Sequence, residues 1–121
     1  MLEIKKTKIY DLEERTYKFA ARCRDLVQLL PKTISNIEYG KQLVRSSGSQ
    51  AANYIEANEA LSKKDFAHRV KICRKEAKES RLWLKLYSTG ENEEFIEEQN
   101  NLIREAGELT KIFNAIVNKS V

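Results

Sequence analysis

Apolar residues recur at alternating steps of three and four along four segments of this 121-residue chain. A β-strand would show alternation at every second residue, whereas steps of three and four keep side chains on one side of an α-helix. The clearest stripe lies in the third segment and consists of Phe66, Val70, Cys73, Ala77, Ser80, Leu84 and Tyr87. The pattern therefore predicts an all-α protein.

Start and stop signals divide the chain into four helices. Asp11 with Glu14, and Ser62 with Asp65, place a capping residue three positions before an acidic one, which is typical of a helix start. Pro31 ends the first helix, because proline disfavours the helical conformation of the residue before it. The short connections predict an antiparallel up-down-up-down four-helix bundle, a single domain of residues 1–121. The expected helices span about 11–30, 36–59, 63–88 and 92–118, after a loosely docked lead before residue 11.

The second helix combines an apolar stripe with unusually small residues. We expect the stripe to consist of Ile37, Val44, Ala51 and Ile55, with Gly40, Ser47 and Gly48 on or beside it. Residues 46–49 are small enough to form a loop, but the stripe continues in phase on both sides of them. We therefore predict a continuous helix whose small residues, Gly48 among them, allow a neighbouring helix to come close.

Polar residues form a row beside this stripe. A row in that position must lie near a helix–helix contact, where buried polar groups need partners. Arg45 is the natural centre, because a guanidinium can hold two carboxylates or amides at once. A network that fixes helix register and a binding site built on the same row are both open interpretations. The predicted network consists of Glu38, Gln42, Arg45, Asn53, Glu56 and, from the third helix, Glu79.

The outer side of the third helix is basic. Its cations form an arc without an intervening acid, here named the basic arc: Lys64, Lys71, Arg74, Lys75, Lys78, Arg81 and Lys85. Nucleic-acid backbones bind such surfaces through charge neutralisation and counterion release, and the net charge of +4 favours polyanionic partners. The alternative is a solvated lysine-rich face. Because the arc has no interleaved aromatic residues, it gives little support for single-strand recognition.

A flank of the third helix has a mixed character. It is too apolar for open solvent and too charged for a core, and it consists of Arg69, Ile72, Glu76, Glu79, Trp83 and Leu86. An oligomer interface would explain it, because tryptophan and arginine are enriched at interface hot spots. A wide helix packing that shelters a few charged pairs would explain it equally well.

The residues needed for catalysis or metal binding are sparse. His68 is the single histidine, and it makes only half of one di-iron helix motif with Asp65. Cys23 and Cys73 fall on apolar stripes and are expected to be buried free thiols. We therefore expect a nonenzymatic protein without metal or cofactor. No apolar run is long enough to span a bilayer and no secretory signal is present, so we expect a cytoplasmic protein without membrane partners.

The second helix also resembles a known family. The stretch Gln-Leu-Val-Arg-Ser-Ser-Gly-Ser from Gln42, followed by Asn-Tyr-Ile-Glu-Ala from Asn53, is similar to proteins encoded in intervening sequences of bacterial 23S ribosomal RNA genes. Val44 stands where that family commonly has arginine, whereas Arg45 matches. The resemblance runs from about Asp11 to Lys119 and is supported by Pro31, Glu38, Tyr39, Gly40, Asp65, Phe66, Glu79 and Leu84.

The resemblance implies an antiparallel four-helix bundle that assembles as a ring-shaped homopentamer. It also implies nucleic-acid association, because a similar bundle, the accessory variability determinant of diversity-generating retroelements, binds a reverse transcriptase and nucleic acid. Two hypotheses follow. In the first, an oligomeric bundle binds RNA or DNA through the basic arc; in the second, it is a scaffold that docks a partner enzyme without touching nucleic acid.

Overall fold

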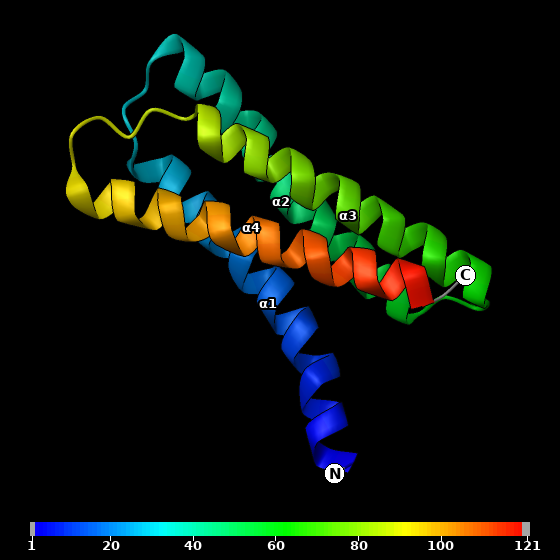
Figure 1. Cartoon of the computed structure of the whole chain (residues 1–121). Coiled ribbons are helices and arrows are strands. Elements are labelled where there is room, and N and C mark those ends of the chain that lie inside the picture. Colours follow the sequence, from blue (N-terminus) through cyan, green and yellow to red (C-terminus); the bar gives the residue numbers. More distant parts are fainter. Residues whose placement is uncertain (1, 120–121) are drawn as a thin grey trace.

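The protein consists of four α-helices. A computed structural model describes the backbone of residues 2–119 and the side chains of residues 12–119, and no strand occurs in this range. The prediction of an all-α fold with four helices is therefore confirmed (Figure 1). None of these helices, as far as they are described, is both long and apolar enough to cross a membrane. Their bounds are Leu2–Leu29 for α1, Ile34–Asn58 for α2, Lys63–Leu86 for α3 and Glu93–Lys119 for α4.

The helix boundaries agree with the capping signals except at the N-terminus. α1 begins at Leu2, whereas a start near residue 11 was expected. The stretch before Asp11 contains no proline or glycine, so nothing in it stops the helix from extending; the cap expected from the Asp11 side chain lies outside the described side chains. At α3, the Ser62 hydroxyl accepts a hydrogen bond from the Asp65 N–H at 3.0 Å, as predicted.

Salt bridges show how α1 lies against α4. The Arg15 guanidinium contacts the Glu105 carboxylate at 2.7 Å, and Arg22 contacts Glu98 at the same distance. Each arginine also donates through Nε, so both pairs are bidentate. The earlier arginine of α1, Arg15, thus pairs with the later glutamate of α4, Glu105, and the later arginine, Arg22, pairs with the earlier glutamate, Glu98. α1 also packs against α2, α2 against α3, and α3 against α4 (Figure 1).

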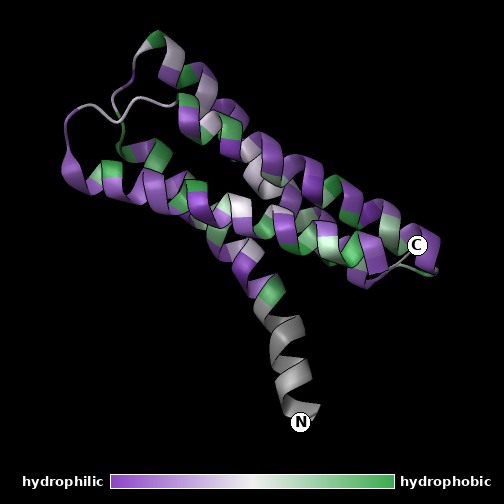
Figure 2. Ribbon diagram, viewed as in Figure 1, coloured by the Kyte–Doolittle hydropathy of each residue, from purple (hydrophilic) through white to green (hydrophobic). Residues whose placement is uncertain are grey.

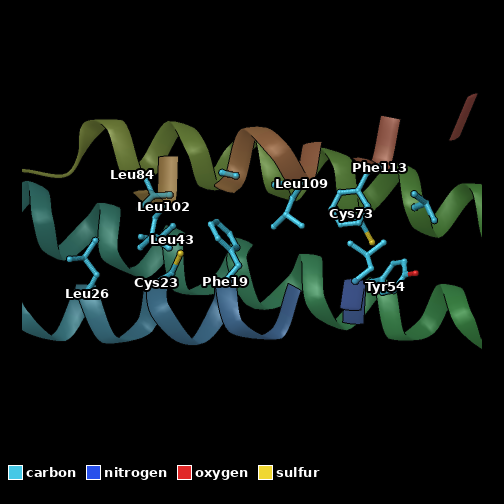
Figure 3. Packing of buried hydrophobic residues seen from close by; sticks show 14 of the residues in the cluster. Phe19, Cys23, Leu26, Leu43, Tyr54, Cys73, Leu84, Leu102, Leu109 and Phe113 are labelled. Carbon is cyan, nitrogen blue, oxygen red and sulfur yellow. The ribbon is translucent and has the colours of Figure 1, made fainter. Parts of the chain in front are cut away.

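Side chains from all four helices meet in one core (Figure 3). The stripe predicted for the third helix is buried there, apart from Phe66, which is partly exposed. Hydrophobic and hydrophilic residues both occur along each helix where Figure 2 colours it, as expected of amphipathic helices. The largest wholly buried apolar side chains are Phe19, Leu43, Val70, Leu84, Leu102, Leu109 and Phe113.

The side of α2 that faces the core differs from the prediction. The helix is continuous through residues 46–49, as expected. However, Ile37, Val44 and Ile55 are exposed by 44%, 44% and 52%. We name the line of residues 37, 41, 44, 48, 51 and 55 the outer stripe. The buried line, here the inner stripe, lies one position earlier and consists of Asn36, Gly40, Leu43, Ser47, Gln50, Tyr54 and Ala57.

The close helix approach predicted at Gly48 occurs at Gly40 instead. A Cβ at Gly48 would have no neighbouring atom within 4 Å, and this residue is exposed. A Cβ at Gly40 would lie 2.7 Å from the Tyr87 hydroxyl oxygen and 3.0 Å from Val27 Cγ1. The prediction for Gly48 was therefore wrong, because the inner stripe has the same four-and-three spacing as the outer one and is the one that packs.

Both cysteines are buried free thiols, as predicted. Burial raises the pKa of Cys23, and it raises the pKa of Cys73 to about 12. Both thiols are therefore protonated and poorly nucleophilic near neutral pH. Among the described side chains, no group of three or more His, Cys, Asp or Glu could hold a metal ion.

Candidate nucleic-acid interface

The basic arc lies on the solvent side of α3. Six of its seven residues are exposed, namely Lys64, Lys71, Lys75, Lys78, Arg81 and Lys85. The exception is Arg74, which is half-buried and donates from Nη1 to Asn114 Oδ1 on α4 at 2.8 Å. The apolar stripe of α3 holds the opposite side of the helix in the core, so helical geometry turns the arc outward.

The arc borders α4, and there the two helices form a groove of about 610 Å³. Its α3 side carries Lys78, Arg81 and Lys85, and its α4 side carries Arg104 and Lys111. We name these five residues the groove cations and the space between them the basic groove. The remaining lining residues are Leu82, Ile103, Gly107, Glu108 and Thr110.

Arg104 and Lys111 were not among the predicted site residues. Together with Gly107 they follow the same steps of three and four that identify a helix side. That spacing marks a shared side of α4 and was a signal available in the sequence. The spacing alone does not show that these residues belong to a site. The packing of α3 against α4 shows it, because it brings cations from both helices to one groove.

The charge of the basic groove is largely unneutralised. Among the described side chains, the one ion pair that includes a groove cation joins Lys111 to Glu108 at 3.8 Å. Arg104 hydrogen-bonds to the neutral side chain of Asn101. Of the remaining arc, Lys75 lies 3.9 Å from Glu79 on its own helix. The groove is therefore a concave surface with an excess of positive charge, which concentrates anions.

The polar row of α2 forms a smaller network than predicted. Arg45 donates to Glu76 at 3.0 Å, to Glu79 at 3.4 Å and to Gln42 at 3.5 Å, so it is the central residue. Glu76, whose side chain is only 7% exposed, receives a positive partner in this way. These contacts hold α2 against α3 and describe a structural role for the network.

Not every predicted member of this network joins it. Asn53 accepts a hydrogen bond from Arg69 at 3.2 Å, about two turns along α2 from Arg45. Glu38 and Glu56 are exposed to solvent. Their placement in the network was wrong because Glu38 lies seven residues before Arg45 and Glu56 eleven residues after it, which is about 10 Å or more along the helix and too far to reach the guanidinium.

The mixed flank of α3 packs against α2. The rings of Trp83 and Tyr39 stack with their centroids 6.0 Å apart. The Arg69–Asn53 and Arg45–Glu76 contacts bridge the same two helices. Helix packing that shelters charged pairs, one of the two predicted interpretations, therefore accounts for most of this flank.

These features define an all-α, four-helix protein with a basic groove between its last two helices. Its family can be named: the sequence model of the 23S rRNA-intervening sequence protein family matches residues 8–115, and the chain belongs to that family. The resemblance carried by the second helix is thus confirmed.

The structure is also similar to a solved one. A crystal structure of a protein with unknown function from the S23 ribosomal protein family of Bacteroides thetaiotaomicron VPI-5482 matches with a TM-score of 0.75. The sequences are 29% identical, and the match covers 88% of this chain and 97% of that chain. No protein among those with curated descriptions matches this sequence.

Proposed function

We propose that this protein is a nonenzymatic, oligomeric bundle that binds RNA or DNA through the basic arc and the groove beside it. The single observation that carries the proposal is the basic groove, where cations from two helices face each other with only one acidic residue among the lining side chains. Phosphate backbones neutralise such clusters and release counterions on binding. The bundle is proposed to run up-down-up-down, which the opposed residue order of α1 and α4 supports.

Charge reversal provides the direct test. Replacing both Lys78 and Lys85 with glutamate should weaken the binding of a mixed-sequence oligonucleotide by at least about tenfold and reduce the slope of log K against log salt by about two. Fluorescence anisotropy between about 50 and 200 mM salt measures both quantities. Both residues are exposed, so the variant should remain folded.

A matched control carries the same charge change elsewhere. Lys18→Glu with Arg24→Glu places two reversals at exposed positions of α1, outside both the basic groove and the outer stripe. This variant should retain binding apart from a small, long-range electrostatic loss. An affinity of the unaltered protein that does not change with salt, or an equal loss in the control, would contradict the proposal.

The outer stripe of α2 supports assembly. Its apolar residues Ile37, Val44 and Ile55 follow heptad spacing yet lie exposed in the single chain. A stripe of this kind is the usual surface for packing against another helix. The family resemblance suggests that the partner is a further copy and that the assembly is a homopentamer.

We expect Val44→Glu to dissociate the assembly, because an unpaired charge would be buried in the contact. Light scattering should show the mass falling to that of a single 14.1 kDa chain. Ile96→Glu, at an apolar position of α4 that is 36% exposed, is the control and should leave the mass unchanged. A monomeric unaltered protein, or an unchanged mass of the Val44 variant, would refute assembly through this stripe.

The second candidate function is a scaffold for a partner enzyme. The observation that favours it is the same exposed outer stripe, which suits any helical partner. Two results together would favour the scaffold over the nucleic-acid binder: a partner protein that stays bound after nuclease treatment, and no measurable oligonucleotide binding by this protein.

A further inference from the structure

We infer that the basic groove binds a single unpaired nucleic-acid strand in preference to a duplex, an inference that rests on the proposed function and names its substrate class. Packed helices lie about 8–10 Å apart, so the groove between α3 and α4 is narrow. The major groove of a duplex alone is wide enough to take a whole α-helix. The duplex is therefore too wide to enter the basic groove and would touch only its two edges, or rims. An extended strand fits between them.

The rims of the groove are suited to phosphates. Lys78 and Lys85 on α3 are seven residues apart, as are Arg104 and Lys111 on α4. Seven residues correspond to about 10 Å along a helix, so both rims carry cations over that length. Arg81 lies between the lysines of the first rim. A strand running along the groove would therefore meet positive charge on both sides.

The lining of the groove has an apolar part, here named the floor, which a surface that touches phosphates alone would not need: Leu82, on the same line of α3 as Lys78 and Lys85, and Ile103 on α4. Leu82 is 48% exposed, and Ile103 is partly buried against the core. An unpaired nucleotide can place its base or sugar on such a floor, whereas the bases of a duplex are already stacked. The guanidinium planes of Arg81 and Arg104 offer stacking surfaces, which replace the aromatic residues that the basic arc lacks.

Gly107 keeps this floor open. A Cβ at this position would meet only Arg81 Nε, at 3.7 Å, which is an ordinary contact distance. Packing of α3 on α4 therefore does not require a glycine here, although glycine within a helix costs about 1 kcal/mol relative to alanine. A side chain larger than Cβ at this position would therefore occupy part of the groove and displace the Arg81 guanidinium.

Filling the floor tests the inference without changing any charge. Gly107→Leu should weaken the binding of a single-stranded oligonucleotide of about 12 nucleotides by about tenfold, the loss of roughly one base contact. Its affinity for the duplex of the same sequence should be unchanged. RNA and DNA versions of both probes are measured by anisotropy. Gln28→Leu, which adds the same apolar side chain at an exposed position of α1 outside the basic groove and the outer stripe, is the control and should leave all affinities unchanged.

The outcomes separate the inference from the proposed function. Equal affinity of the unaltered protein for single strand and duplex, with no effect of Gly107→Leu, would overturn the inference while leaving nucleic-acid binding in place. Failure to bind either probe would overturn both. A change of oligomeric mass in the Gly107 variant would mark the groove as a contact between copies and overturn the inference. A selective loss of single-strand binding supports it.

Discussion

Gly40→Leu should lower the free energy of unfolding by about 2–3 kcal/mol, whereas Gly48→Leu should raise it by about 0.5–1 kcal/mol. At Gly40 even a Cβ would come within 2.7 Å of the hydroxyl oxygen of the buried Tyr87 and 3.0 Å of Val27 Cγ1, so a larger side chain must displace the Tyr87 ring and the Val27 side chain of α1. At Gly48 a Cβ would meet no atom within 4 Å outside its own helix backbone, and leucine replaces the residue with nearly the lowest helix propensity.

Thermal or urea denaturation measures the two variants side by side. A change of 1 kcal/mol corresponds to roughly 4 °C in Tm for a chain of this size, so the shifts should be readily resolved and opposite in sign. Shifts of the same sign would mean that both glycines occupy equivalent environments and that the inner stripe is not the packed side of α2. Circular dichroism provides the check that both variants remain helical.

The second large effect concerns Asn36, a buried polar residue of the inner stripe that is 1% exposed. Its Nδ2 donates to the carbonyl oxygens of Pro31 and Ser88, both at 2.8 Å, and its Oδ1 accepts from the Ser88 N–H at 3.0 Å. One side chain thus joins the connection before α2 to the one after α3. Asn36→Ala should cost about 3 kcal/mol, because three backbone groups lose their partner.

The control for Asn36 is Asn100→Ala, which removes the same amide from an exposed position of α4. Its unfolding free energy should change by less than about 0.5 kcal/mol. A loss below about 1 kcal/mol in the Asn36 variant would show that other groups satisfy the two connections, and would contradict the role assigned to this side chain.

Much of the fold could be predicted because its signals are local. The stripe from Val70 to Leu84 and the cap at Ser62 depend on spacing within one helix, and the structure reproduces both. The outward placement of Lys71, Lys78 and Lys85 follows from the same spacing. These features need no knowledge of neighbouring helices.

The sequence by itself thus determined the four helices, most of their bounds, the family and the cationic side of α3. The tertiary structure alone decided which of two equally spaced stripes of α2 is buried, which glycine lies at a close approach, and how Arg104 and Lys111 meet the basic arc. The physical reason is that helical periodicity is a property of one segment, whereas burial and grooves arise where two segments meet. On α2 the side that packs against the other helices carries small and polar residues such as Gly40, Ser47 and Gln50, whereas Ile37, Val44 and Ile55 stay exposed.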